Sequence, residues 1–268
     1  MASSSLLPAQ RRGRIHELLR TQGAVKVTDL SERLKVSEIT IRRDLEVLEQ
    51  EGILERTHGG AIYSHRMRVE PLYMEKDRIH RDEKELIGRA AAQLVEDGDT
   101  LLINSGSTTL QVIRHLVGKK NIRIITSNAG AVLAVQDSDV DLMLIGGSFR
   151  PQSNSLVGPL AVLSLQQIYG SKAFIGVDGI SAKYGLTTPI LHEAEVARLI
   201  IERTRGLVIV VADHSKLGVV ADFVTAPLEK VDILVTDGGF DDEYRSGLEE
   251  PGVKITIASH DSINPFTR

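Results

Sequence analysis

The stretch Val36-Ser-Glu-Ile-Thr-Ile-Arg-Arg-Asp-Leu45 decides the fold of the N-terminal part of the chain, because it is typical of a capped helix. Ser37 is a favourable N-cap, since its hydroxyl can accept a hydrogen bond from an amide of the first turn. The helical pattern extends to about Gln50, and Gly52 would terminate it. We therefore expect one helix that begins just after Ser37.

This helix has an apolar face and an opposite polar face, because successive residues are about 100° apart around a helix. The residues expected in the core are Ile41, Leu45 and Leu48. Those expected on the opposite, exposed face are Ile39, Thr40, Arg43 and Glu46, with Arg42 to one side.

The neighbouring segments complete a winged helix-turn-helix. Upstream, we expect a helix over Arg12–Gln22 and, capped by Thr28, a short helix over Asp29–Leu34, which a tight turn at Lys35–Val36 joins to the capped helix. Downstream, a Gly-Gly turn separates two short strands, which predicts a β-hairpin. Its parts are Ile53–Arg56, Thr57–Gly60 and Ala61–Tyr63.

An exposed Arg pair beside Thr and Ile near a helix N-terminus suits the major groove of DNA. Arg can bond guanine edges or phosphates, Thr can bond either, and Ile39 can contact a thymine methyl group. Arg56 and His58, on the hairpin, can approach the DNA backbone. The alternative is a small helical bundle whose Arg residues form a solvated face. The order of helices, turn and hairpin favours DNA binding.

These residues carry a resemblance to a known family. Val36–Leu45, followed by Glu51-Gly-Ile-Leu54 and Arg56-Thr-His-Gly-Gly-Ala61, resembles the winged helix of the DeoR family of bacterial transcriptional regulators. The resemblance covers about 12–63. It implies that the recognition helix that meets operator DNA includes Ser37, Thr40, Arg42 and Arg43.

Composition and charge restrict the class of protein. The 268 residues include no Cys, which excludes disulfides, thiolate metal sites and a cysteine nucleophile. No run approaches the roughly 20 apolar residues of a membrane span, so we expect no membrane partner and a cytoplasmic protein. The net charge of −4 divides into +2 for residues 1–70 and −6 for the remainder. Positive charge for DNA must therefore act locally, at Arg42, Arg43, Arg56 and Arg11–Arg14.

The C-terminal part alternates short apolar runs with helical patterns, which is typical of a mostly parallel sheet covered on both faces. The expected strands are Thr100–Ile103, Ile122–Thr126, Asp141–Ile145, Ala173–Val177, Leu207–Ala212, Ile233–Thr236 and Lys254–Ala258. The expected helices are Lys84–Val95, Thr108–Val117, Ala129–Val135, Pro159–Ile168 and Glu193–Thr204. The fold class is therefore α/β, a winged helix-turn-helix followed by a mostly parallel α/β domain.

The loop after the first of these strands is a candidate anion site. A small-residue loop between a strand and a helix N-terminus offers free backbone amides and the helix dipole to a phosphate. Its residues are Asn104, Ser105, Gly106, Ser107, Thr108 and Thr109. This is neither a Walker A loop nor a GxGxxG motif. The alternative is an ordinary strand–helix turn that uses Ser and Thr as caps.

Loops after other strands should converge on the same place, because ligands of open α/β sheets bind outside the carboxyl ends of the strands. Arg or Lys would serve a phosphate, whereas Asn and Asp would suit sugar hydroxyls. The candidate residues in these loops are Asn128, Gly147, Arg150, Asp178 and Lys216.

This half resembles the sensor domain of the same family, itself similar in fold to ribose-5-phosphate isomerase. The motifs that carry the resemblance include Ile145-Gly-Gly147, Ser155-Leu-Val-Gly-Pro159, Val177-Asp-Gly-Ile180, Gly185-Leu-Thr-Thr188 and Ala212-Asp-His-Ser-Lys216. The resemblance implies a phosphorylated sugar as effector, with its phosphate on Ser105–Thr109 and its polar body near Asp178, Glu193 and Lys216. The family often has Asp where this chain has Asn104.

We expect a transcriptional regulator of carbohydrate genes. The preferred interpretation is a repressor that its effector releases from operator DNA, although the sequence does not decide between repression and activation. Paired half-sites predict a homodimer or a larger even homo-oligomer. The expected divisions are a flexible N-terminus at 1–11, the DNA-binding domain at 12–63, a linker at 64–83, the sensor at 84–260 and a tail at 261–268.

The competing hypothesis is a sugar-phosphate isomerase that uses Glu193 as base, assisted by Asp178. A first-turn helix carboxylate explains Glu193 equally well, and an attached DNA-binding domain suits a sensor better than a metabolic enzyme. His192–Val196 begins like a zinc-binding His-Glu-x-x-His motif, but Val196 replaces the second His. We therefore expect no enzyme, no metal and no cofactor.

Overall fold

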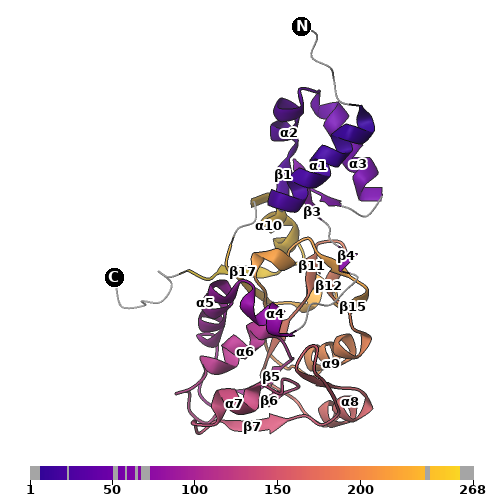
Figure 1. Cartoon of the computed structure of the whole chain (residues 1–268). Helices are drawn as coiled ribbons and strands as arrows, with labels where there is room; N and C mark the ends of the chain where they lie inside the picture. The colour runs from indigo at the N-terminus through magenta and orange to yellow at the C-terminus, as the bar shows by residue number, and fades with distance from the viewer. Residues whose placement is uncertain are drawn as a thin grey trace, which may run out of the picture.

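The computed structural model describes residues 7–22, 24–50, 54–57, 59–63, 66–67, 73–238 and 242–259. His58 and Gly52, which the sequence analysis singled out, lie outside these ranges. The N-terminal elements are α1 (Pro8–Gln22), β1 (Ala24–Lys26), α2 (Val27–Leu34), α3 (Glu38–Gln50), β2 (Leu54–Arg56) and β3 (Gly60–Tyr63). The strands form an antiparallel sheet in the order β1-β3-β2, and the unit lies at one end of the molecule (Figure 1).

The predicted helix-turn-helix and hairpin are present. Ile41, Leu45 and Leu48 of α3 are buried against α1 and α2, as the helical spacing predicted. Ser37 caps α3, because its Oγ accepts a hydrogen bond from the Thr40 amide at 3.3 Å. In the turn, Lys35 adopts a left-handed conformation with φ 52°, which lets the chain reverse within three residues.

Three local predictions for this unit were wrong. Helix α1 begins at Pro8 rather than Arg12, since proline fits the first turn of a helix. Helix α2 begins at Val27, so Thr28 lies inside it and is not the cap. The cause is β1, which was not predicted: it pairs with β3 and leads directly into α2. Arg11 is buried in an ion pair with Asp44 of α3 and is not available to DNA.

The C-terminal unit is built on seven parallel strands in the order β17-β16-β13-β10-β5-β6-β7. In chain order they are β5 (Thr100–Ile103), β6 (Arg123–Thr126), β7 (Asp141–Leu144), β10 (Lys172–Gly176), β13 (Val208–Val211), β16 (Ile233–Thr236) and β17 (Lys254–Ile257). Every predicted strand is present, with each end within one residue of its predicted place. The fold class is confirmed.

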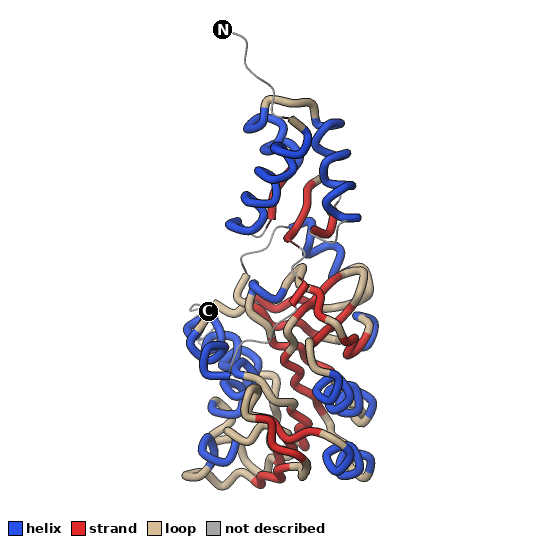
Figure 2. Tube along the Cα trace, turned by 45° about the vertical axis from the view of Figure 1, so that its right-hand side comes forward, coloured by secondary structure: helices blue, strands red, loops and turns tan. Residues whose placement is uncertain are grey.

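Helices cover both faces of this sheet (Figures 1 and 2). One face packs against α5 (Arg81–Ala92), α6 (Ser107–Arg114) and α7 (Ala131–Val135). The other face packs against α8 (Pro159–Gln166), α9 (Leu191–Glu202) and α10 (Asp242–Glu249). Side chains alternate between the two cores along each strand, so Leu101 and Ile103 lie in one core and Leu102 lies in the other.

The sequence analysis did not predict several shorter elements of this unit. They are β4 (Arg66–Met67), α4 (Tyr73–Arg78), β8 (Ser148–Arg150), β9 (Ser155–Val157), β11 (Gly179–Ser181), β12 (Gly185–Thr188), β14 (Val220–Ala221) and β15 (Phe223–Ala226), with single-turn helices at His214–Lys216 and Leu228–Lys230. Strands β11, β12 and β15 form an antiparallel sheet, and β4 pairs with β14. No helix in the described ranges is both long and apolar enough to cross a membrane.

The close approach of α5 and α6 depends on Gly88. A Cβ atom added there would lie 2.6 Å from Cβ and 2.7 Å from the carbonyl carbon of Gln111. We expect Gly88→Ala to lower the free energy of unfolding by about 1–3 kcal/mol, because the backbone of α6 would have to move. Urea unfolding followed by circular dichroism measures this change. The control is Gly247→Ala in α10, where the nearest atom is 3.6 Å away and helix propensity predicts no loss.

Candidate functional site

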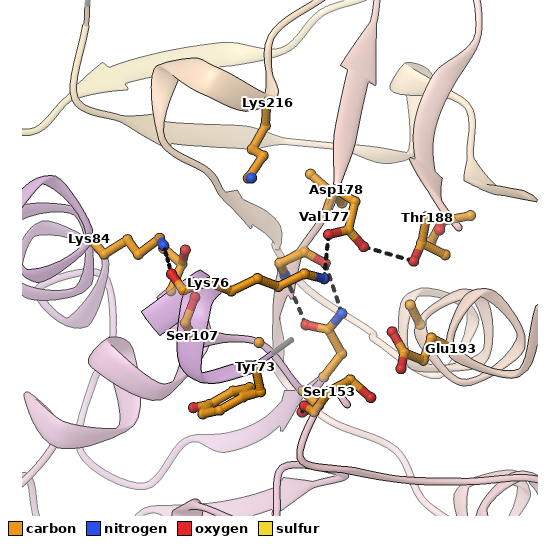
Figure 3. Close-up of a pocket in the computed structure, with 17 residues that line it drawn as sticks. Tyr73, Lys76, Lys84, Ser107, Ser153, Val177, Asp178, Thr188, Glu193 and Lys216 are labelled. Carbon is orange, nitrogen blue, oxygen red and sulfur yellow. Dashed lines mark hydrogen bonds and ion pairs between the residues drawn. The ribbon is translucent and has the colours of Figure 1, made fainter. Parts of the chain in front are cut away.

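A pocket lies at the carboxyl ends of β5 and β10, where the strand order places the loops that follow them side by side. It encloses about 660 Å³ of space, part of it open to solvent. Loop residues 104–108 line one side of the pocket, and residues 176–178 line the adjoining side (Figure 3). Its position is the one at which open α/β sheets bind ligands.

Asn104 fixes the two strand ends to each other. Its Nδ2 donates to the Gly176 carbonyl and its Oδ1 accepts from the Gly176 amide, both at 2.8 Å. The rest of the loop is also held: the Ser105 amide donates to Ser127 Oγ at 3.0 Å, and Thr109 Oγ1 donates to the Asn104 carbonyl at 2.9 Å. The loop therefore has a fixed shape before any ligand arrives.

The loop ends at the N-terminus of α6, where backbone N–H groups have no acceptor within the helix. Ser107 and Thr108 occupy this first turn and line the pocket. Amides, hydroxyls and the positive end of the helix dipole here are suited to an anion such as a phosphate.

Two carboxylates form the opposite wall (Figure 3). Asp178 Oδ2 accepts a hydrogen bond from Thr188 Oγ1 at 2.9 Å. Glu193 Oε1 accepts from Arg150 at 3.2 Å and from Ser155 Oγ at 3.3 Å. Arg150 therefore lies behind Glu193 and orients it, rather than facing the pocket. Carboxylates held in this way are suitable acceptors for sugar hydroxyls.

Three lysines also line the pocket, namely Lys76, Lys84 and Lys216. Lys76 Nζ lies 2.7 Å from Asp178 Oδ1, and Lys84 Nζ donates to the carbonyls of Lys76 and Ile79. Burial lowers the pKa of Lys84, although nearby Asp213 opposes the effect. The site thus combines cationic and anionic groups, as a ligand with a phosphate and several hydroxyls requires.

Asp213 is a buried carboxylate beside these lysines. Its Oδ1 accepts from the Ser215 amide at 3.0 Å, whereas its Oδ2 has no hydrogen-bond partner within the described residues. Burial acts to raise the pKa of Asp213, but Lys216, Ser215 and Lys84 outweigh it and hold the pKa below its ordinary value. The ionised carboxylate therefore offsets the positive charge around the pocket.

The structure separates the predicted effector-binding residues into two groups. Those that line the pocket are Asn104, Ser105, Gly106, Ser107, Thr108, Asp178, Glu193 and Lys216. Those that do not line it are Thr109, Asn128, Gly147 and Arg150. Thr109 and Asn128 are fully buried behind the loop, where Asn128 Nδ2 donates to the Gly106 carbonyl at 3.1 Å. Gly147 packs against the Val157 carbonyl, which a Cβ atom would approach to 2.5 Å.

Sequence reasoning missed nine lining residues, most of which come from outside the strand-end loops. They are Tyr73, Lys76, Lys84, Ser153, Gly176, Val177, Thr188, Ala197 and Thr225. Tyr73 and Lys76 lie on α4, which immediately follows the segment from the DNA-binding unit, and Lys84 lies on α5. Burial raises the pKa of Tyr73 to about 12, so its phenol stays protonated.

The exposed face of α3 is the candidate DNA-binding surface. Ile39 is 66% exposed, and Arg42 and Arg43 are also exposed. Arg42 lies 3.6 Å from Glu38, whereas no ion pair joins Arg43 to another described residue. Ser37 and Thr40 share a hydrogen bond at 2.9 Å at the N-terminus of the helix.

Arg56 joins the wing to α3 through two ion pairs, one to Glu46 at 2.7 Å and one to Glu49 at 3.2 Å. Its guanidinium is thus already bonded, and contact with DNA would require it to leave at least one glutamate. Within the part of the chain that the structure describes, no cluster of three or more His, Asp or Glu side chains could hold a metal ion.

Comparison with known proteins covers both units. The family model described as "DeoR C terminal sensor domain" matches residues 79–238, and the "DeoR-like helix-turn-helix domain" matches residues 11–67. The HTH-type transcriptional regulator GlpR of Haloferax volcanii is 33% identical over 93% of this chain and 98% of its own. The HTH-type transcriptional regulator GolR of Listeria innocua is 31% identical over 94% of this chain and all of its own.

A further relative is a putative aga operon transcriptional repressor of Escherichia coli O157:H7, 32% identical over 93% of each chain. Among solved structures, ribose 5-phosphate isomerase from Methanocaldococcus jannaschii covers 52% of this chain and 55% of its own, with a TM-score of 0.39 and 19% identity. The relatives named here are transcriptional regulators that match nearly the whole chain.

The environment of Asp213 predicts how stability depends on pH. The pKa of Asp213 is lower in the folded protein than the unfolded value of 3.8. Its ionised carboxylate therefore stabilises the folded state above pH 3.8, and this stabilisation is lost as the pH falls through the folded pKa. We expect Asp213→Asn to cost about 1–3 kcal/mol at neutral pH. The difference from wild type should shrink below about pH 4.

Urea unfolding at several pH values measures this dependence, followed by circular dichroism because the chain has no Trp. Asp222→Asn is the control, since that carboxylate is exposed. A wild-type advantage over Asp213→Asn that did not change with pH would contradict the prediction.

Proposed function

Because this chain belongs to the DeoR family of transcriptional regulators, we propose that it is a repressor of sugar-related genes whose operator binding is controlled by a phosphorylated sugar. That it is a DNA-binding regulator follows from the family. The sign of control and the chemical class of effector are the proposal. We retain the divisions at 12–63 for DNA binding, 64–83 for the linker and 84–260 for the sensor.

One observation carries the effector class: a rigid loop of amides and hydroxyls at the N-terminus of α6 faces two oriented carboxylates across a pocket that lysines also line. We place the phosphate at Ser105–Thr108 and the hydroxyls at Asp178 and Glu193. The name of the aga operon relative, a putative repressor, supports a repressor role. We propose no catalytic role for Glu193.

We also propose that the protein binds DNA as a homodimer or a larger even assembly. A helix-turn-helix places its recognition helix in one major groove, and two such helices read paired half-sites. The described part of the chain contains one such helix, α3. Simultaneous binding of two half-sites would compensate for the weakly basic charge of the N-terminal unit.

Arg43 is exposed and has no ion-pair partner among the described residues, so its guanidinium is available to DNA. We expect Arg43→Ala to weaken operator binding by about 1–3 kcal/mol if the guanidinium bonds a base edge. Electrophoretic mobility shift with an operator fragment selected by the wild-type protein measures this. Arg123→Ala, on the exposed end of β6, is the matched control. Equal DNA affinity in Arg43→Ala would remove Arg43 from the interface.

The second prediction concerns Lys216, whose ammonium lines the pocket. Lys216→Ala should weaken the thermal stabilisation by pentose or hexose monophosphates, because a ligand that binds only the folded state raises its stability. DNA affinity without ligand should stay unchanged. Lys230→Ala, an exposed lysine outside the pocket, serves as control. An unaltered ligand response in Lys216→Ala would remove that lysine from the site.

A further inference from the structure

Helix α4 (Tyr73–Arg78) reaches into the proposed effector pocket through two of its side chains, Tyr73 and Lys76. Figure 3 shows the Lys76 side chain extended across the middle of the pocket toward Asp178. The Lys76 and Asp178 side chains are 16% and 12% exposed, so their ion pair is largely shielded from solvent. An ion pair in this environment is screened less than one at the surface.

Helix α4 packs against α6, and the following polar contacts also fix its position. Its first residue, Tyr73, donates its amide to the Gln152 carbonyl at 2.7 Å. Its last turn is held by Lys84, which donates to the carbonyls of Lys76 and Ile79. The Lys76–Asp178 pair is the contact that joins α4 to the carboxyl end of β10. A helix of one and a half turns has little stability of its own, so such contacts decide where it lies.

The same segment is the covalent path to the DNA-binding unit. The chain passes from wing strand β3 to β4, which pairs with β14 of the sensor, and then to α4 and α5. Because β4 is paired with β14, the chain leaves the sensor at β4, and a change in the position of α4 reaches the DNA-binding unit through β4. No residue of α4 lies in the core clusters, so α4 can move without opening either core.

Both carboxylate oxygens of Asp178 accept a hydrogen bond in this structure. Oδ1 bonds Lys76, and Oδ2 accepts from Thr188, which is buried in β12 and cannot withdraw. A carboxylate oxygen can accept more than one hydrogen bond, so sharing Oδ1 does not by itself exclude a ligand. A ligand hydroxyl placed where the Lys76 ammonium now lies must nevertheless displace it, because two groups cannot occupy the same position. Lysine has a long flexible stem, which makes it the partner that can leave.

We propose that Lys76 is an intramolecular competitor of the effector: in the ligand-free protein its ammonium occupies the hydroxyl subsite at Asp178, and effector binding breaks this pair and allows α4, within the linker, to move. This inference rests on the proposed function, because it takes Asp178 as an effector contact. It names the event by which occupancy of the pocket changes the DNA-binding unit. We call the Lys76–Asp178 pair the latch. Coupling follows because the effector hydroxyl and the Lys76 ammonium cannot both occupy the same position beside Asp178 Oδ1.

The first test needs no effector. Hydrogen–deuterium exchange of the full ligand-free chain reports how often α4 opens. The latch predicts faster exchange of the peptide covering α4 in Lys76→Met and in Asp178→Asn, by about threefold to tenfold. Lys230→Met should leave that peptide unchanged. Unchanged exchange of α4 in both pocket variants would overturn the latch, whatever the effector proves to be.

The second test uses calorimetric titration with pentose and hexose monophosphates, with inorganic phosphate and unphosphorylated sugars as separate arms. Removal of a competitor raises apparent affinity, so Lys76→Met should bind the wild-type ligand roughly threefold to tenfold more tightly. Lys76→Arg, which keeps the charge, should restore weaker binding. In the mobility-shift assay, Lys76→Met should also require less ligand to release operator DNA.

The outcomes separate the two proposals. Tighter binding in Lys76→Met supports the latch. Weaker binding would make Lys76 a direct phosphate contact, and equal binding would make it a bystander, and either result overturns the latch. If wild type binds none of the sugar monophosphates, the proposed effector class fails, and the exchange experiment alone decides whether the latch exists.

Discussion

The side-chain amide of Asn104 is the constraint on which the pocket depends. It bonds both the amide and the carbonyl of Gly176, so it fixes the relative position of the β5 and β10 ends. An aspartate at this position could accept from the Gly176 amide, but an ionised carboxylate could not donate to the carbonyl. The uncharged amide of Asn104 therefore makes a pair of hydrogen bonds to Gly176 that an ionised aspartate could not make.

The sequence could predict the sheet and about half of the residues that line the pocket, because both follow from the pattern of the strands. Seven apolar runs of strand length identify the parallel strands. In a parallel sheet the loops that follow the strands all lie at one edge. Asn104–Thr108, Asp178 and Lys216 were found in this way, whereas Glu193 came only from the family resemblance. The spacing cannot tell which loop residues face inward. Thr109 and Asn128 point back into the loop, and Arg150 acts through Glu193.

Several of the missed residues, such as Tyr73, Lys76 and Thr188, belong to elements with weak local signals. Helix α4 spans six residues, which is too short for a helical period to be read, and strands β11, β12 and β15 have three or four residues each. Their position comes from tertiary contacts, such as Lys84 capping α4 and Tyr244 donating to the Ile180 carbonyl at 2.8 Å. The same holds for Arg56, whose partners on α3 are seven and ten residues away. The charge pattern of the sequence alone predicts that such an arginine binds DNA. In the structure, Arg56 forms ion pairs with two glutamates.

The wing also contacts the sensor, which gives movement of α4 a second route to the DNA-binding unit. Glu55 of β2 accepts a hydrogen bond from Ser181 of β11 at 2.7 Å, and burial raises the pKa of this carboxyl. Strand β11 begins directly after Asp178, the partner of Lys76. The strand that carries Arg56 toward α3 is therefore joined, through Glu55, to the same short segment that forms the pocket wall. A change at Asp178 can reach α3 through the linker and through β11, so the two units need not move as independent bodies joined by a tether.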